Sequence, residues 1–272
     1  MRKFFKNLDD FFSIINSQIG KPKSVKLVST GWTNFVYIAK SKKGKFVFRF
    51  PRNAFFARAL EKECEFLQQL YQHDSTLPIP KLRLFYYKNR PYSVHRYIPG
   101  KSMTQARLLE YQKTRLAKEI VEFLFALSNF TPNMKLPKTS TFLARLSKVS
   151  GNGGYDLSKH APLIYAEKQH LTLTHGDLNP GNIIIKNGRL KAVLDFAFVS
   201  YCSPLDDVAR LIGRLQGDFA KFLLPVFESK FNIKVSESDV ENLTGVWNYV
   251  EQKYVEYIKL NHPDIILPKN FS

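Results

Sequence analysis

Two kinds of hydrophobic spacing alternate along the first hundred residues. Apolar side chains three and four positions apart predict an opening helix over residues 3–18 and a second helix over 55–73. Short apolar runs bounded by turn residues predict strands over 25–29, 35–40, 45–50, 82–87 and 92–97, and the run at 45–50 has a period of two. Residues 1–97 are therefore predicted to form a five-stranded antiparallel sheet with one or two helices.

Helical spacing dominates from residue 98 onward. A long apolar stripe predicts a helix over 104–130, and shorter stripes predict helices over 208–215, 219–227 and 240–260. Residues 131–139 are predicted to be a proline-containing connector, and 151–154 a glycine-rich loop. The whole pattern predicts an α+β protein of two lobes, with a sheet lobe at 1–97 and a mainly helical lobe at 98–272.

One hairpin interrupts the helical half. Two apolar runs, 182–186 and 190–194, flank the turn Lys-Asn-Gly-Arg at 186–189, and Asn-Gly is typical of tight β-hairpin turns. Polar residues stand at its ends: His-Gly-Asp at 175–177 precedes the first strand, Asn182 begins it, and Asp195 follows the second. The candidate chemistry of the chain is therefore concentrated around this hairpin.

The spacing of these polar residues is that of a kinase catalytic loop. Asp177 and Asn182 are five positions apart, and Asp-Phe-Ala at 195–197 lies where Asp-Phe-Gly would follow. One carboxylate can accept a hydroxyl proton, while an amide oxygen and a second carboxylate can hold Mg²⁺ over a nucleotide triphosphate. Each fragment alone would be a turn or a strand cap. The ordered set favours phosphoryl transfer.

The run His-Gly-Asp-Leu-Asn-Pro-Gly-Asn at 175–182 resembles the aminoglycoside phosphotransferase and choline kinase family of small-molecule kinases. In the place of Gly176, protein kinases carry arginine. The resemblance implies a bilobal protein-kinase-like fold, and transfer of phosphate from ATP to a hydroxyl of a small molecule with Mg²⁺. It also implies that Asp177 is the catalytic base and that Asn182 and Asp195 bind the metal.

Two further residues are expected to support this loop. By the same resemblance the position of Asp207 braces the catalytic loop, and its separation from Asp195 fits the family pattern. We expect His175 to brace the loop as well, and not to carry a proton.

Nucleotide-binding residues are expected in the first lobe. Residues 29–34 join the first two strands and have the layout of a nucleotide-covering hairpin, so backbone amides around Gly31, Thr33 and Asn34 are candidates for phosphate contacts. In a kinase fold the third strand carries a cation that pairs with the phosphates and with a helix glutamate. Arg49 is the candidate there, and the alternative is an exposed strand arginine.

The partner of Arg49 is expected on the helix at 55–73. Its Glu63 resembles the glutamate of the family's Glu-x-x-x-Leu-x-x-Leu segment, with Glu61 and Glu65 as alternatives. The resemblance also implies a hinge at the turn Ile-Pro-Gly, 98–100. There the backbone near Arg96 and Ile98 would bind adenine.

The formal net charge of +18 is unevenly distributed. Residues 1–140 contain 26 Lys and Arg against 9 Asp and Glu, which leaves 15 against 14 for residues 141–272. A basic first half suits an anionic nucleotide, nucleic acid or an acidic partner, and it also suits a simply solvated surface, which we favour. Aromatics and arginines are not interleaved in one motif, so a nucleic-acid partner is disfavoured. The alternative function is a nucleotide-binding protein with little catalysis that docks an anionic partner or nucleic acid.

Other features concern the setting of the protein. Cys64 and Cys202 lack metal or redox spacing and are predicted to be reduced thiols of a cytoplasmic protein. No segment of the sequence is long and apolar enough to predict a membrane partner.

The phosphate acceptor stays open. The near-neutral second half gives no support to a polycationic aminoglycoside and does not exclude one. Choline-kinase relatives often carry Glu at the position of Ala197, which counts against choline. Sugars, amino alcohols such as homoserine, and nucleosides remain. Gly176 and the absence of an Ala-Pro-Glu segment after Asp195 count against a protein kinase.

Overall fold

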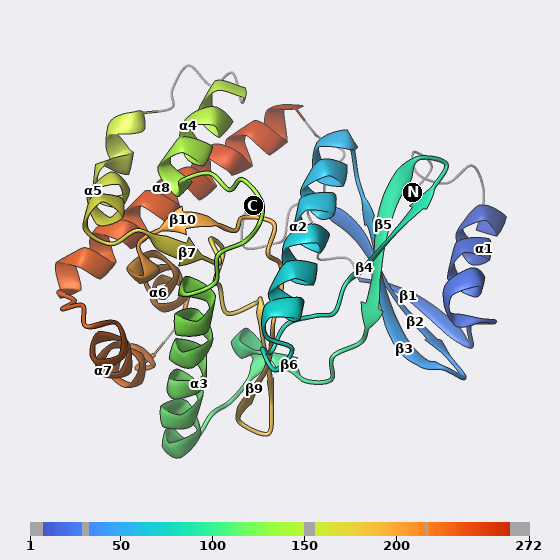
Figure 1. Cartoon of the computed structure of the whole chain (residues 1–272), viewed down its shortest axis with the longest axis horizontal. Coiled ribbons are helices and arrows are strands. Elements are labelled where there is room, and N and C mark those ends of the chain that lie inside the picture. The colour runs from blue at the N-terminus through green and yellow to red at the C-terminus, as the bar shows by residue number, and fades with distance from the viewer. Residues whose placement is uncertain (1–7, 29–32, 150–155, 216, 262–272) are drawn as a thin grey trace. The chain divides into compact units, whose positions relative to one another are not determined.

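The computed structural model describes residues 8–28, 33–149, 156–215 and 217–261, and the chain divides into two units, the first ending at Ile98 and the second beginning at Pro99 (Figure 1). The predicted boundary lies between residues 97 and 98.

A five-stranded antiparallel sheet forms the N-terminal unit. Its strands are β1 (Ser24–Val28), β2 (Asn34–Ser41), β3 (Gly44–Pro51), β4 (Arg83–Tyr87) and β5 (Arg90–Arg96), in the order β1-β2-β3-β5-β4. β4 and β5 are joined by a two-residue turn in which Lys88 and Asn89 have φ values of 48° and 60°. Two positive φ values match the turn to the twist of the strands. The five predicted strands are thereby confirmed.

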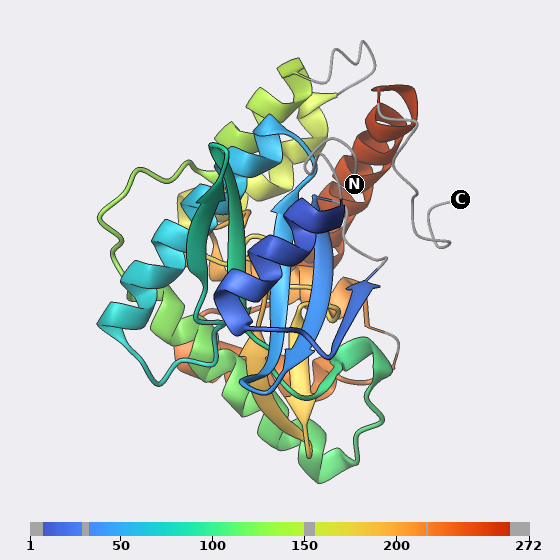
Figure 2. The same cartoon turned by 90° about the vertical axis from the view of Figure 1, so that its right-hand side faces the viewer.

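The two faces of this sheet carry different side chains because consecutive residues of a strand point to opposite faces. Phe48 and Phe50 of β3 are fully buried in a cluster with Phe11 and Ile15 of helix α1 (Leu8–Ile19), which lies across the strands (Figure 2). Helix α2 (Ala54–His73) contacts β3 and β5 on the opposite side. Arg49, between the two phenylalanines, therefore points toward α2.

The C-terminal unit is mainly helical. Its elements are β6 (Lys101–Ser102), α3 (Glu110–Ser128), α4 (Thr139–Val149), α5 (Ala161–Gln169), β7 (Thr172–Thr174), β8 (Ile183–Lys186), β9 (Arg189–Val193), β10 (Ser200–Cys202), α6 (Pro204–Gly213), α7 (Ala220–Phe231) and α8 (Glu237–Asn261), with 3₁₀ turns η1 (Met103–Gln105) and η2 (Leu157–His160). The strands form a sheet β6-β8-β9 and a pair β10-β7. The predicted α+β fold with an antiparallel sheet first and helices after it is confirmed.

The hairpin at the centre of the sequence argument is present. β8 and β9 pair antiparallel, and Asn187 and Gly188 have φ values of 54° and 70° in the turn between them. Both values are positive, as a type I′ turn requires. The hairpin is held on the buried stripe of α3, in which Leu116, Ile120 and Leu124 are nearly inaccessible.

One predicted helix begins at the wrong residue, and four elements of the structure were not predicted. The helix predicted over 104–130 begins at Glu110, because the Met103 backbone N–H donates to Pro180 and the Leu109 N–H is capped by the Gln112 side chain. Neither contact can be inferred from the spacing of the apolar residues. The pattern also failed to predict α4, α5, β7 and β10, whose short apolar stretches become regular only in contact with their neighbours. None of the helices within the described ranges has both the length and the apolar character of a membrane span.

Candidate active site

The loop from His175 to Asn182 joins β7 to β8, and its second residue is a glycine that no other residue replaces easily. Gly176 has φ +75°, a left-handed conformation that L-residues avoid. A Cβ atom there would lie 2.1 Å from the carbonyl oxygen of Phe198. Both facts explain why this position carries glycine here and leave no room for the arginine that protein kinases have.

Asp207 ties the backbone of this loop to α6. Its two carboxylate oxygens accept the backbone N–H groups of His175, at 2.7 Å, and of Gly176, at 2.9 Å. The side chain is fully buried in the first turn of α6. Burial and the adjacent Asp206 carboxylate raise the pKa of Asp207 to about 7, against the two N–H donors and Arg210, which lower it.

His175 makes internal contacts only. Its Nε2 lies 3.0 Å from the carbonyl oxygen of Leu194, so this nitrogen carries the proton, while Nδ1 accepts the backbone N–H of Asp177 at 3.2 Å. The ring packs against Phe196. Burial lowers the pKa of His175 to about 3. A neutral ring with both nitrogens engaged links the loop to the end of β9.

The Asp177 carboxylate is the one titratable group of the loop that reaches solvent, with a quarter of its side chain exposed. Its Oδ2 accepts from the Asn182 amide at 3.1 Å, and its Oδ1 lies 3.6 Å from Nη1 of Arg210. Burial raises the pKa of Asp177, while Arg210, the Asn179 side chain, the charge of Arg214 and the amide of Asn182 act in the opposite direction. The group is therefore a held, partly accessible acceptor for a proton.

Asn182 and Asp195 meet at the open end of the β8–β9 hairpin. The backbone N–H of Leu194 donates to the carbonyl of Asn182 at 2.8 Å, which sets Asp195 one residue beyond that pair. The Asn182 side-chain nitrogen donates to the carbonyl of Asp177, so the amide oxygen is the end that remains for a cation. Asp195 has φ +67°, a strained value that functional residues often adopt.

These donors suit a hard divalent cation. An amide oxygen and a carboxylate on neighbouring strand ends match the oxygen preference of Mg²⁺, which usually takes only one or two carboxylates from protein. No group of three or more His, Cys, Asp or Glu side chains with metal-binding geometry occurs in the described part of the chain, and Mg²⁺ does not require one.

Arg210 next to Asp177, and the two residues that contact Arg210, were not predicted from the sequence as parts of the site. Arg210, four residues after Asp206 on α6, donates from Nε to that carboxylate at 3.3 Å. The guanidinium lies over the ring of Trp247 on α8, and the indole Nε1–H donates to Asp206 at 2.6 Å. The sequence feature that could have identified them is a pair of charged residues, Asp206 and Arg210, four positions apart in an otherwise largely apolar helix. The helical spacing of Trp247 indicates a packing residue, and its ring does pack.

In the N-terminal unit, Arg49 pairs with Glu63 as predicted. Nη1 contacts Oε1 and Nη2 contacts Oε2, each at 2.8 Å, so the pair is bidentate. The glutamate side chain is fully inaccessible and the arginine side chain is 12% exposed. Of the alternatives, Glu61 instead accepts from the Tyr86 hydroxyl, and Glu65 is exposed. Arg49 is thus held in one orientation and is not an exposed strand arginine.

The other predicted nucleotide-binding residues lie at the ends of the sheet. Gly31 falls outside the described residues. Thr33 precedes β2 and its hydroxyl accepts from the buried Asn34 side chain. Arg96 ends β5, and its carbonyl lies 2.9 Å from Nδ1 of His95. Ile98 is half-buried at the end of the unit.

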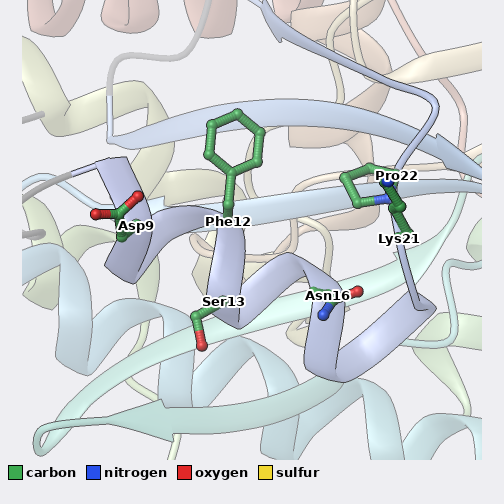
Figure 3. Close-up of a pocket in the computed structure, with 6 residues that line it drawn as sticks. All are labelled: Asp9, Phe12, Ser13, Asn16, Lys21 and Pro22. Atoms are coloured by element: carbon green, nitrogen blue, oxygen red, sulfur yellow. The ribbon is translucent and has the colours of Figure 1, made fainter.

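A shallow pocket of about 580 Å³ lies beside α1 in the N-terminal unit (Figure 3). Residues of the helix and of the segment after it line the pocket: Asp9, Phe12, Ser13, Asn16, Lys21 and Pro22. None of the predicted site residues is among them. The pocket is therefore separate from the residues that carry the candidate chemistry.

Comparison with known families decides the class of protein. The model of the phosphotransferase enzyme family matches residues 24–229. The chain belongs to the phosphotransferase enzyme family. The matched range includes both β3, with Arg49, and the whole segment from His175 to Asp207.

Solved structures of other phosphotransferases share the fold. The GDP complex of aminoglycoside 2′-phosphotransferase-IIIa is 19% identical, with a TM-score of 0.70, over 97% of this chain and 94% of that chain. A macrolide 2′-phosphotransferase from Brachybacterium faecium is 14% identical, with a TM-score of 0.68, over 94% of each chain. The streptomycin–ATP complex of APH(2″)-IIa is 18% identical, with a TM-score of 0.64, over 91% and 90%. A sequence comparison with curated proteins gives no match.

Proposed function

We propose that this phosphotransferase transfers the γ-phosphate of ATP to a hydroxyl group of a small molecule. The observation that carries the proposal is the arrangement around Asp177. Its carboxylate is partly accessible and held by Asn182 and Arg210, in a loop whose backbone is tied to Asp207. Such a group can take a proton from an attacking hydroxyl without reorganising, which is the role of the base in kinase chemistry.

In this proposal Asp177 orients the acceptor hydroxyl and accepts its proton as the new oxygen–phosphorus bond forms and the bond to the leaving ADP oxygen breaks. Asn182 and Asp195 would hold Mg²⁺, which would neutralise charge on the phosphates during transfer. The intact set of Asp177, Asn182 and Asp195 favours catalysis over a protein that merely binds a nucleotide.

The N-terminal unit, residues 1–97, would bind the nucleotide. Arg49, fixed by the bidentate contact with Glu63, would pair with phosphate oxygens, as the corresponding cation does in kinases. Backbone amides around Gly31, Thr33 and Asn34 would add phosphate contacts. By the family resemblance the backbone near Arg96 and Ile98 would bind adenine. Residues 98–272 would supply catalysis and the acceptor site.

The cell compartment follows from the chemistry proposed. ATP is a cytoplasmic substrate, and Cys64 and Cys202 are both buried and unbridged. Burial raises the pKa of Cys64 to about 12, so this thiol resists oxidation. We therefore expect the enzyme to act in the cytoplasm.

The acceptor is to be found by assay. Phosphate transfer from radiolabelled ATP with Mg²⁺ should be tested on aminoglycosides, macrolides, choline, ethanolamine, homoserine, sugars and nucleosides. We expect acceptor-dependent turnover that falls at least about 100-fold in Asp177→Asn and Asp195→Ala, since general base catalysis alone supplies that order of magnitude. The matched control is Asp218→Asn, an exposed aspartate paired with Lys113, which should keep the wild-type rate.

Two results would refute the proposal. Turnover that survives Asp177→Asn would refute the assignment of Asp177 as the base. No turnover on any acceptor together with no binding of magnesium-ATP in calorimetry would remove the phosphotransferase activity itself.

A second candidate function rests on the charge of the N-terminal unit. Residues 11–60 contain ten Lys and Arg and no Asp or Glu, and Lys40, Lys42, Lys43 and Lys45 are all exposed around the turn between β2 and β3. A docking surface for nucleic acid would bind a labelled oligonucleotide with an affinity that falls steeply from 50 to 200 mM salt. We expect weak binding, as for a solvated surface. Tight binding that is lost in a Lys42→Glu/Lys43→Glu variant would favour docking.

A further inference from the structure

Arg210 is the cation nearest to the proposed catalytic carboxylate, and three of its contacts restrict it. Nη1 faces Oδ1 of Asp177 at 3.6 Å, and Nε donates to Oδ2 of Asp206 at 3.3 Å. The flat face of the guanidinium lies over the indole ring of Trp247. A guanidinium is planar and its five N–H groups have a fixed geometry, so holding its Nε edge and one face also sets the direction of Nη1.

The partners that hold Arg210 are themselves fixed. Asp206 is fully buried and accepts on its second oxygen from the Trp247 indole at 2.6 Å. Arg210 is 7% exposed and Trp247 8% exposed. In such surroundings a charged group keeps its place because few other partners are available to it. Asp206, Arg210 and Trp247 therefore form a closed ring of contacts between α6 and α8.

We propose that Arg210 is a positioning residue for Asp177, and that Asp206 and Trp247 set the orientation of its guanidinium. Helix α8 would thus act on the catalytic loop through α6. The proposal rests on the proposed function to the extent that Asp177 is the base. Asp207 holds the backbone of the loop and Arg210 holds the carboxylate, so two residues on one helix, three positions apart, restrain both parts.

A neighbouring pair on the same two helices supplies a matched control. Four residues after Arg210, at the C-cap of α6, Arg214 contacts Glu251, which is four residues after Trp247 on α8. This second pair has the same charges, but its side chains are 37% and 25% exposed, and it forms no hydrogen bond or ion pair with Asp177 in the described part of the chain. The charge of Arg214 does lower the pKa of Asp177 across space, so the control variant has to keep that charge. Glu251→Gln therefore breaks this ion pair while the Arg214 charge, and Arg210 with its own contacts, stay in place.

The first test requires no substrate. The sequence contains two tryptophans, Trp32 and Trp247, so the indole region of a ¹H–¹⁵N spectrum holds two signals, which Trp247→Phe assigns. In Asp177→Asn the Trp247 indole signal should move, because Arg210 loses one anionic partner and its position over the ring changes. Asp195→Asn removes another aspartate charge of the proposed site and should leave that signal in place. In an Arg210→Met background, Asp177→Asn should no longer have an effect.

An unchanged Trp247 signal in Asp177→Asn would overturn the proposal. So would an effect of Asp177→Asn that persists in the Arg210→Met background, because the effect would then not pass through the guanidinium. Both outcomes are independent of turnover, so a failure of the proposed function can be distinguished from a failure of the positioning role of Arg210.

The second test uses magnesium-ATP turnover, with the best acceptor or with water. Arg210→Met should lower kcat about 10-fold, since a charge-assisted contact contributes about that factor, and should leave KM for ATP within about 2-fold. Arg210→Lys should recover part of kcat, and Trp247→Phe, which keeps a ring but loses the indole N–H, should lose less than Arg210→Met. Glu251→Gln should match the wild type.

Correct folding of each variant is checked by circular dichroism and by the melting temperature. Arg210→Lys and Trp247→Phe keep volume and most packing, so they remain informative where Arg210→Met does not fold. A kcat that is the same in the wild type, Arg210→Lys and Trp247→Phe would overturn the proposal, as would equal losses in Glu251→Gln and Trp247→Phe.

Discussion

Replacing Gly176 by alanine tests the geometry of the catalytic loop most directly. The residue has φ +75°, and the added Cβ would lie 2.1 Å from the carbonyl oxygen and 2.8 Å from the carbonyl carbon of Phe198. Neither backbone atom can turn away as the end of a side chain would. The loop must therefore shift, and Asp177, the next residue, must shift with it.

The cost has two parts. Holding an alanine in the left-handed region costs about 1–2 kcal/mol, and forcing a methyl group into a packed site costs about 1–3 kcal/mol. Gly176→Ala should therefore lower the free energy of unfolding by about 2–5 kcal/mol. Gly20→Ala is the matched control, because Gly20 has φ +73° and no described atom lies within 4 Å of its added Cβ. It should show the first part alone.

Urea unfolding followed by far-UV circular dichroism measures both variants. Activity gives a second measurement, because a shift of about 1 Å in a catalytic group can reduce turnover about 100-fold. Gly20→Ala should keep the wild-type kcat. If Gly176→Ala destabilises the protein no more than Gly20→Ala does, the close approach of Phe198 to this glycine is wrong.

Three further predictions concern buried charged or titratable groups. Glu63→Ala should lower the free energy of unfolding in urea by about 3–5 kcal/mol, because it leaves Arg49 without its bidentate partner, whereas Glu61→Ala should stay within about 0.5 kcal/mol; equal losses would contradict this. Asp207→Asn should lower kcat about 10-fold or more, since one backbone N–H of the loop then faces an amide N–H; wild-type kcat would contradict the bracing role. The pKa of His175 is lowered to about 3 from 6.5, so the unfolded chain binds the proton first and stability is lost as the pH falls from 6.5 toward 3, with a slope of up to about 1.4 kcal/mol per pH unit. Asp207, whose pKa is raised to about 7, contributes with the opposite sign over part of this range, so the slope is read as the difference between the wild type and His175→Gln in urea titrations at each pH, and parallel curves for the two proteins would count against a buried neutral imidazole.

Sequence patterns correctly predicted the structural features that depend on residues close together in the chain. The period of two in β3 and the Asn-Gly pair of the β8–β9 turn depend only on nearby side chains and backbone angles, and the structure contains them. The order Asp177, Asn182, Asp195 is also a local property, because the hairpin itself brings its two ends together. Residues 175–182 are accordingly sufficient to indicate the family.

Sequence patterns fail where contacts with a distant segment of the chain determine the local structure. The helix predicted from residue 104 begins at Glu110 because the backbone near Met103 bonds to Pro180. The short elements α4, α5, β7 and β10 carry too few residues for a period to emerge, and they are defined by the surfaces they pack against.

The sequence by itself determined which residues carry the proposed chemistry and the elements on which they lie. Only the tertiary structure decided what holds them: Glu63 and not Glu61 against Arg49, and Asp207 under the backbone of the loop. It also brought Arg210 to Asp177 and Trp247 to Arg210. The physical reason is that periodicity reports which face of an element is buried, whereas the partner of a buried polar group is set by the packing of segments far apart in the chain.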